Sequence, residues 1–267
     1  MLSSNIRSLQ TTNIVNDTHQ ASKSESTPDS GKKYYSDGQE RYNFFNFSNQ
    51  LHVDTRGFGA QISDLLNMFS DPDFRKNHPE YRDVFPEECT AIYLQTAQDY
   101  SLHSPSSGKD IALYRDVNET LRKSHFSKEA NSELDENMKR ISPHVKMLTS
   151  ALNRIIDVAP YKGTAYRGIR GSAEQIEHLY GLYKSNSFYV EPAFMSTTKN
   201  KESAQVFEKN TPNNIAFEII INKGADIKAA TQAPSEEEVM LIAGSRFKID
   251  SAMKIENDKH LFKLIQI

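Results

Sequence analysis

The acidic run Glu236-Glu237-Glu238 carries the residues of this chain that are best suited to catalysis. If Glu238 opens a strand, Glu236 and Glu238 point to the same side, because side chains alternate along a strand. Two carboxylates in one cleft repel each other and raise a pKa unless a cation is near, so such pairs are kept chiefly where catalysis uses them. Taken alone, however, an acidic run is more often a solvated turn.

A second segment, Tyr166-Arg167-Gly168, could bind an anion. Arg167 comes at the end of a short predicted strand that begins at Thr164. Its planar guanidinium has five donors that suit a diphosphate or a ribose, and Gly168 would let the backbone approach a ligand closely. Taken alone, a structural salt bridge is the commoner explanation of such an arginine.

The third segment, Phe194-Met195-Ser196-Thr197-Thr198, is rich in hydroxyl groups. Strand alternation would place Phe194, Ser196 and Thr198 on one face. Strands of this composition are common, so this segment alone does not indicate a function.

In this order the three segments resemble the Arg-Ser-Glu mono-ADP-ribosyltransferases, a family of bacterial toxins, type III effectors and vertebrate ecto-enzymes. In that family an aromatic-Arg pair is followed by Ser-Thr-Ser after an aromatic residue, and then by Glu-x-Glu entering a strand. Residues 113–122 also look like the family's Tyr-x-x-x-Asn-x-x-x-Arg helix, so the resemblance covers about residues 80–267. It implies cleavage of NAD at the nicotinamide-ribose bond and transfer of ADP-ribose to a protein side chain.

The resemblance implies which residues hold NAD. Arg167, beside Gly168, would bind a phosphate and the adjoining ribose through charge-assisted hydrogen bonds. Thr197 and Thr198 would shape the nicotinamide pocket together with Ser196. Phe207 falls where related toxins place an aromatic ring over nicotinamide, although a core phenylalanine is an equal alternative.

The same resemblance implies the catalytic roles. Ser196 would orient Glu238, which would accept a hydrogen bond from the nicotinamide-ribose 2′-OH as oxocarbenium charge develops. Glu236 would orient the acceptor and take a proton from it. In the family a Glu here accompanies arginine acceptors, whose guanidinium is protonated at ordinary pH. Two alternatives stay open: a NAD glycohydrolase in which water replaces the acceptor, and a non-catalytic module that binds NAD or ADP-ribose.

The partner implied is a host protein, because relatives modify small GTPases, actin and other host proteins. NAD is a consumed substrate, and no metal is expected because no His, Cys and carboxylate cluster has ligand spacing. Two departures from the family pattern concern recognition and binding. Thr198 replaces the last Ser, and the loop 229–235 lacks the aromatic residue that several toxins use to contact their targets. The sequence does not identify the target, nor whether a host activator is required.

Composition excludes several classes of partner. The net charge of the 267-residue chain is −3 and no long basic run occurs, so neither nucleic acid nor an anionic membrane is favoured. No stretch approaches the roughly 18 apolar residues of a membrane span. A single cysteine, Cys89, excludes an intramolecular disulfide and suits a reducing compartment. We expect a monomer.

The first 40 residues differ from the rest in composition. They lack the apolar core of a Sec signal peptide, and their polar stretch 21–38 cannot bury enough apolar surface to order itself. They predict either an ordinary disordered tail or a Ser/Thr/Asn-rich leader of the kind that type III secretion uses. With the resemblance, the second alternative predicts an effector secreted without a Sec signal that acts in the host cytoplasm.

The elements that must position these residues fall into two halves of one domain, residues 41–267. Apolar residues at helical spacing predict helices at 91–100, 111–121 and 138–155, separated by a loop at 101–110, so residues 41–158 form a helical part. The strand-rich part, 160–267, has predicted strands at 164–167, 193–197, 215–221, 238–242, 246–249 and 261–267, with a turn at 222–224. Helices followed by strands indicate an α+β fold. The resemblance implies N-terminal helices packed on a mixed, mostly antiparallel two-sheet core of the ADP-ribosyltransferase type.

Overall fold

The computed structural model describes residues 34–35, 37–53, 60–104, 108–127, 131–206, 214–255 and 259–267. Its α-helices are α1 (Gly38–Ser48), α2 (Ile62–Ser70), α3 (Pro72–Asn77), α4 (Pro86–Thr96), α5 (Leu113–Phe126), α6 (Ser132–Val158), α7 (Ala173–Lys184) and α8 (Lys201–Val206). Short 3-10 helices are η1 (Pro79–Tyr81), η2 (Lys228–Ala230) and η3 (Pro234–Glu236). The strands are β1 (His52–Val53), β2 (Tyr100–Ser104), β3 (Lys109–Ala112), β4 (Tyr161–Arg170), β5 (Phe188–Glu191), β6 (Met195–Thr198), β7 (Asn214–Asp226), β8 (Glu238–Leu241), β9 (Ser245–Ile255) and β10 (Lys259–Gln266). The fold is α+β, as the order of the sequence patterns predicts.

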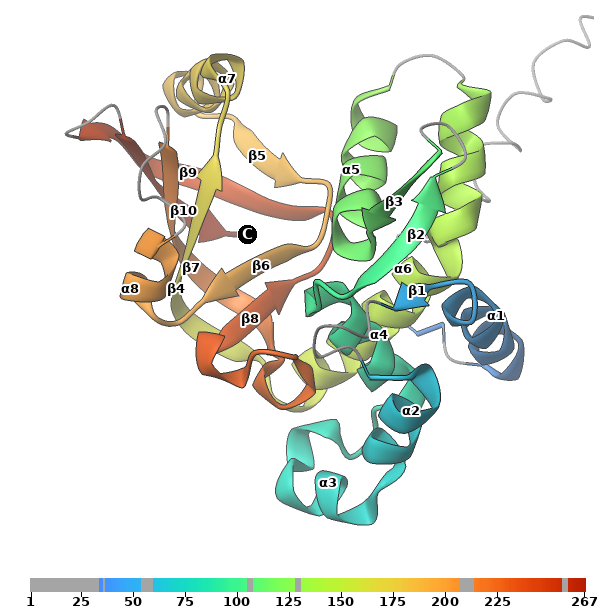
Figure 1. Cartoon of the computed structure of the whole chain (residues 1–267). Coiled ribbons are helices and arrows are strands. Elements are labelled where there is room, and N and C mark those ends of the chain that lie inside the picture. Colours follow the sequence, from blue (N-terminus) through green and yellow to red (C-terminus); the bar gives the residue numbers. More distant parts are fainter. Residues whose placement is uncertain are drawn as a thin grey trace, which may run out of the picture.

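The helical half is centred on α6. The side chain of Asn131 begins this helix by accepting a hydrogen bond from the Leu134 N–H at 3.1 Å. Helices α1, α4 and α5 pack against α6, as Figure 1 shows. Every residue of the apolar face predicted at 138–155 is buried: Met138, Ile141, Val145, Leu148, Leu152 and Ile155. The helix predicted here is therefore confirmed, and its apolar face forms the helical core.

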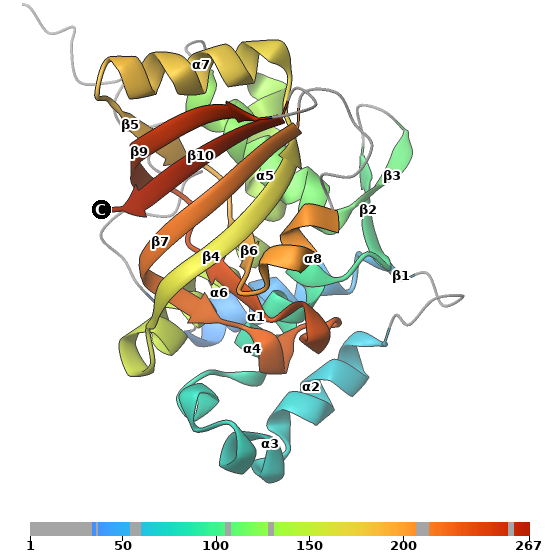
Figure 2. The same ribbon diagram turned by 90° about the vertical axis from the view of Figure 1, so that its left-hand side faces the viewer.

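The strand half is a seven-stranded sheet in the order β4-β6-β8-β7-β10-β9-β5, in which β4 also pairs with β7. This additional pairing closes β4, β6, β8 and β7 on one another, so the strands form two layers that share β4 and β7 (Figure 2). Strand β10 runs parallel to β7, whereas the other pairs of described strands are antiparallel. A mixed, mostly antiparallel two-sheet core is thus confirmed.

Strand β7 does not end at the turn predicted for residues 222–224, and that prediction is wrong. The strand continues to Asp226, where its last two residues pair with β8. The side chain of Gln266 accepts hydrogen bonds from the N–H groups of Asn222 and Lys223, at 2.9 and 2.8 Å, where pairing with β10 has ended. Turn-forming residue types therefore mark the place where one strand passes between two layers.

The loop predicted at 101–110 is also wrong, because its ends form the hairpin β2-β3, which joins β1 in a small sheet. Tyr100 and Leu102 of β2 are buried in the helical core. Their burial overrides the Ser, Pro and Gly content that indicated a loop. As a result α4 ends at Thr96 and α5 begins at Leu113, so Tyr100 and Ile111 lie on strands and not on the helices predicted for them.

The described part of the domain begins before the predicted boundary at residue 41. Tyr35 is buried, and its N–H donates to the Ser150 Oγ at 3.2 Å. Asp37 caps α1 by accepting from the Glu40 N–H at 2.9 Å. Residues 1–33, most of the proposed leader, lie outside the described residues.

The domain has two apolar cores, and the first of them joins its two halves. One fills the helical half and includes Phe194, Ile227 and Met240 from the strand half. The other lies within the strand half, between the sheet and α7, which lies above β9 and β10 in Figure 2. Helices α4 and α5 thereby come to face β6 and β8 (Figure 1). No helix within the described ranges is long and apolar enough to cross a membrane.

Candidate active site

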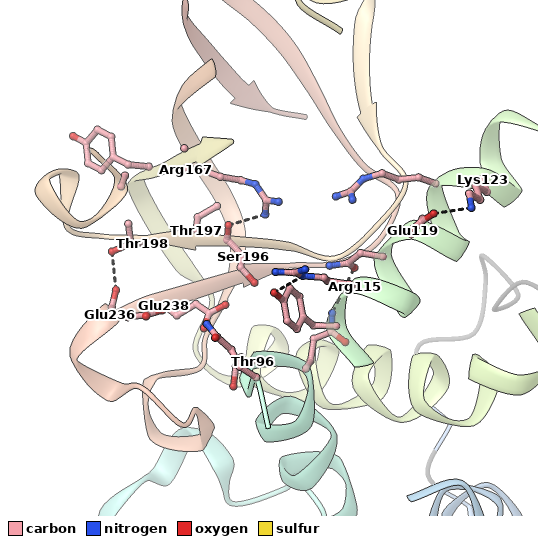
Figure 3. Close-up of a pocket in the computed structure, with 18 residues that line it drawn as sticks. Thr96, Arg115, Glu119, Lys123, Arg167, Ser196, Thr197, Thr198, Glu236 and Glu238 are labelled. Carbon is pink, nitrogen blue, oxygen red and sulfur yellow. Dashed lines mark hydrogen bonds and ion pairs between the residues drawn. The ribbon is translucent and has the colours of Figure 1, made fainter. Parts of the chain in front are cut away.

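A cleft of about 600 Å³ separates α4 and α5 from β4, β6 and β8. Figure 3 shows Arg167, Ser196, Glu236 and Glu238 around this space, with Arg115 pointing into it from α5. Seven of the eight residues that the sequence nominated line the cleft: Arg167, Gly168, Ser196, Thr197, Thr198, Glu236 and Glu238. The eighth, Phe207, lies outside the described residues. Three separated segments of sequence therefore converge on one site.

Arg167 extends from β4 into the cleft. Its Nη1 donates to the Ser196 carbonyl oxygen at 2.9 Å, which fixes the guanidinium against β6 (Figure 3). Burial lowers the pKa of Arg167, and the carboxylate of Glu191 opposes this shift. An arginine remains charged under either influence, so the cleft contains a fixed positive charge.

The two threonines of β6 hold the acidic segment in place. Thr197 Oγ1 donates to the Val239 carbonyl oxygen, and Thr198 Oγ1 donates to the Glu236 carbonyl oxygen, both at 2.7 Å. Thr198 Oγ1 also accepts from the Asn200 N–H at 3.0 Å. Thr198, which replaces the last Ser of the family pattern, thus keeps a hydroxyl group at this position. That hydroxyl anchors the backbone of Glu236.

Glu236 and Glu238 both line the cleft, whereas Glu237 does not. The predicted same-side arrangement is present, but strand alternation does not produce it. Glu236 ends η3, Glu237 has left-handed backbone angles (φ 48°, ψ 48°), and only Glu238 belongs to β8. A tight turn therefore brings the two acids together. The Glu237 carboxylate lies 3.8 Å from the Lys228 Nζ.

Glu238 is the most perturbed acid of the site, with only 6% of its surface exposed. Burial raises its pKa to about 7. A hydrogen bond with the Ser196 side chain opposes the rise, the neighbouring Glu236 adds to it, and Arg167 opposes it. A carboxyl group with such a pKa is close to half ionised near neutral pH, and a cationic ligand would favour its charged form.

The facing wall, made by α4, the segment just after it and α5, holds cleft residues that the sequence did not nominate. They are Gln95, Thr96, Gln98, Tyr114, Arg115, Asn118, Glu119, Arg122 and Lys123. Tyr114, Asn118 and Arg122 recur every four residues, so they share one helix face. This spacing is the signal that could have identified them, because the Tyr-x-x-x-Asn-x-x-x-Arg pattern was visible. Arg115 is fixed by its Nε, which donates to the Tyr114 hydroxyl at 2.8 Å.

The cleft is suited to a ligand with two anionic groups. Arg115, Arg122 and Arg167 all line it, and Glu236 and Glu238 lie at its other end, beside Thr96 (Figure 3). Among the described residues, no three His, Cys, Asp or Glu side chains are grouped so as to hold a metal ion. The arginines at one end could bind phosphates, and the carboxylates at the other end could stabilise a cationic sugar. This arrangement fits a dinucleotide that is broken at its glycosidic bond.

The fold and the cleft are those of a mono-ADP-ribosyltransferase. The profile of the ADP-ribosyltransferase exoenzyme family matches residues 109–266, which is more than half of the chain. The chain therefore belongs to the ADP-ribosyltransferase exoenzyme family, whose enzymes consume NAD.

Solved structures agree with this assignment. The ADP-ribosyltransferase HopU1 of Pseudomonas syringae pv. tomato DC3000 is 54% identical, with a TM-score of 0.78 over 88% of this chain and 100% of its own. The type III effector XopAI of Xanthomonas axonopodis pv. citri is 17% identical, with a TM-score of 0.62 over 89% of this chain and 91% of its own. Vis toxin of Vibrio splendidus is 22% identical, with a TM-score of 0.52 over 84% of this chain and 90% of its own. No curated protein sequence matches the chain.

Proposed function

We propose that this ADP-ribosyltransferase modifies an arginine side chain of a host protein. The observation that carries the proposal is the position of Glu236, which lines the same cleft as Glu238 although a left-handed turn residue separates them. Glu238 is buried, whereas Glu236 belongs to the exposed turn before β8. This difference in exposure supports a role for Glu238 toward the sugar and for Glu236 toward an acceptor that arrives from solvent.

In the proposed reaction Arg167 anchors the diphosphate of NAD, and Ser196 orients Glu238. The C–N bond between nicotinamide and ribose breaks, and its electron pair leaves with nicotinamide. Glu238 accepts a hydrogen bond from the ribose 2′-OH, an interaction that strengthens as positive charge develops at C1′. A guanidinium nitrogen then bonds to C1′, and Glu236 takes the proton that this nitrogen loses.

The acceptor side of the proposal is tested with Glu236→Gln. Labelled NAD is supplied with agmatine, a small guanidino compound, and with host lysate, and both transfer and free ADP-ribose are measured. Transfer should fall by roughly a hundredfold or more, because a general base typically contributes about 10²–10⁴-fold, whereas NAD hydrolysis should persist. Glu238→Gln is the matched variant and should abolish both. Equal transfer by Glu236→Gln and the unmutated protein would refute an arginine acceptor.

The same assay tests the two alternative functions, a NAD glycohydrolase and a binding module. Hydrolysis without transfer to any acceptor would indicate a NAD glycohydrolase, and NAD binding without turnover would indicate a binding module. Mass spectrometry of the modified lysate protein would identify both the target and the modified residue.

The proposed setting is that of a bacterial effector delivered into a host cell without a Sec signal, with a host protein as its partner. The Ser/Thr/Asn-rich composition of the first residues supports delivery of this kind. Fusion of residues 1–40 to a reporter, followed by secretion assays in a strain with and without its type III apparatus, tests it. Equal export by both strains would contradict the proposal.

A further inference from the structure

A buried carboxylate, Glu191, lies behind the wall of the cleft and outside the set of residues that line it. It ends β5 and has 4% of its surface exposed. Its Oε1 accepts from Arg122 Nε at 3.0 Å and from the Ala193 N–H at 3.2 Å, and its Oε2 accepts from the Tyr189 hydroxyl at 2.8 Å. Each oxygen therefore has a donor, and the charge of Glu191 is directed to Arg122.

Within the described part of the chain, the Arg122 guanidinium is held at one edge, its Nε. Glu191 occupies its Nε, so the terminal amino groups of the guanidinium remain available on the side of the cleft, which Arg122 lines. The exposures of the two side chains agree with this geometry, because 37% of the Arg122 side chain is exposed but only 6% of the Glu191 side chain. A guanidinium fixed in this way is preorganised for a second, anionic partner.

Glu191 also acts on the second arginine of the site. Among the charges around Arg167, that of Glu191 does most to oppose the effect of burial on its pKa, whereas Arg122 lowers that pKa further. Arg122 and Arg167 thus repel each other, and Glu191 is their shared counter-charge. Figure 3 shows the Arg167 guanidinium pointing across the cleft toward α5, the helix that carries Arg122.

We propose that Glu191 is a positioning residue, which holds Arg122 opposite Arg167 so that the two guanidiniums form one site for the diphosphate of NAD. The inference rests on the proposed role of Arg167 in binding NAD. Because Glu191 belongs to β5 and Arg122 to α5, the same ion pair sets the distance between the helical and strand walls where the diphosphate would lie.

The experiment compares Glu191→Gln with Tyr189→Phe. The first removes the charge at nearly constant size, and the second removes one neutral donor to the same carboxylate. ADP-ribose and nicotinamide are measured as competing inhibitors, since only the former carries the diphosphate. Glu191→Gln should raise the KM for NAD and raise the inhibition constant of ADP-ribose roughly tenfold or more. This is the effect of losing a hydrogen bond to a charged group. Its kcat and its inhibition by nicotinamide should change far less, and Tyr189→Phe should have a much smaller effect on ADP-ribose.

Unchanged ADP-ribose inhibition in Glu191→Gln would overturn the proposal, and so would an equal loss of nicotinamide inhibition, which indicates general damage to the cleft. If Glu191→Gln does not fold, Arg122→Lys tests the same claim, because it keeps the positive charge but loses the fork that Glu191 holds. That variant should also weaken ADP-ribose selectively, and full retention of affinity would overturn the proposal. Arg167→Gln separates the two levels of inference: if it too leaves ADP-ribose binding unchanged, the proposed NAD site itself is wrong.

Discussion

Three neighbours act on Glu238, and they determine in which protonation state the enzyme meets NAD. Burial and Glu236 favour the neutral carboxyl group, whereas Ser196 and Arg167 favour the carboxylate. The proposed reaction requires the carboxylate, because only a charged oxygen stabilises the developing oxocarbenium ion. Ser196 therefore has a chemical role that can be tested apart from the architecture around it.

We expect kcat/KM for NAD to fall as the pH is lowered through about 7, the pKa of Glu238. The sign follows from the reactive form, which is the carboxylate and is lost below that pKa. Ser196→Ala removes the hydrogen bond that opposes the rise of the pKa, so its profile should move to higher pH and its rate at pH 7 should drop. Initial rates of NAD cleavage between pH 5 and 9 measure both effects.

Thr197→Ser is the control for the pH profile of Ser196→Ala. The hydroxyl of residue 197 donates to the Val239 carbonyl oxygen and not to Glu238, and serine keeps this hydroxyl. Its midpoint should stay near that of the unmutated protein. A Ser196→Ala profile that superimposes on the unmutated one would show that Ser196 does not set the ionisation of Glu238.

At the scale of elements, the pairing of the end of β7 with β8 depends on one glycine. A Cβ at Gly224 would lie 2.6 Å from Val239 Cγ1 and 3.0 Å from Ile221 Cγ2. Both neighbours are buried β-branched side chains with little room to move. Close approach here allows the last residues of β7 to pair with the strand that begins at Glu238.

Gly224→Ala should therefore destabilise the protein by about 1–3 kcal/mol, the usual cost of overpacking a core. It should also lower the rate of NAD cleavage, because β8 must shift away from β7 and carries Glu238 with it. Chemical denaturation and initial rates measure the two effects.

Gly181→Ala is the matched control in helix α7, where the new Cβ would meet nothing within 4 Å. Since alanine is the better helix former, this variant should gain about 0.5–1 kcal/mol of stability. Equal stability of the two variants would refute the close-packing argument.

Sequence patterns predicted elements best where packing follows a simple period. The apolar face of α6 and the motif residues of β4, β6 and β8 were found because periodicity or family resemblance marked them. The hairpin β2-β3 was missed because its polar composition is offset by the burial of Tyr100 and Leu102, which only the tertiary structure provides. Residues 222–224 were misassigned for a similar reason, since the side chain that satisfies their backbone comes from Gln266, far along the chain.

The site was predicted from the strand side and missed from the helix side. Arg167, Ser196 and Glu238 belong to three short motifs, whose order along the chain and resemblance to a known family nominated them. The spacing of Tyr114, Asn118 and Arg122 could have nominated Arg122, but Glu191 becomes informative only through its distance to Arg122, which fold topology sets and local sequence does not encode. The left-handed conformation of Glu237, which brings Glu236 and Glu238 together, could not be predicted either, because glutamate rarely adopts it.

At the scale of the whole molecule, the cleft lies between two halves that share a core. Phe194 and Met240 from the strands are buried among the helices. The Tyr81 hydroxyl, from the helical half, donates to the Asp226 carbonyl oxygen at 3.1 Å, and Gln232 Nε2 donates to Asp99 Oδ2 at 2.6 Å. Both bonds tie the segment that precedes Glu236 and Glu238 to the helical half, which carries the opposite wall of the cleft.

This sharing predicts that the two halves unfold together and that ADP-ribose stabilises both. At a ligand concentration about a hundred times its dissociation constant, the added stability is about 2.7 kcal/mol. For a domain of this size that gain corresponds to a rise in Tm of roughly 5–10 °C. Calorimetry should show a single transition that moves as a whole, because a ligand between the walls binds only when both are folded. Two separate transitions, with only one displaced by ADP-ribose, would mean that one half supplies the binding site alone and that the opposing wall, including Arg122, contributes nothing to affinity.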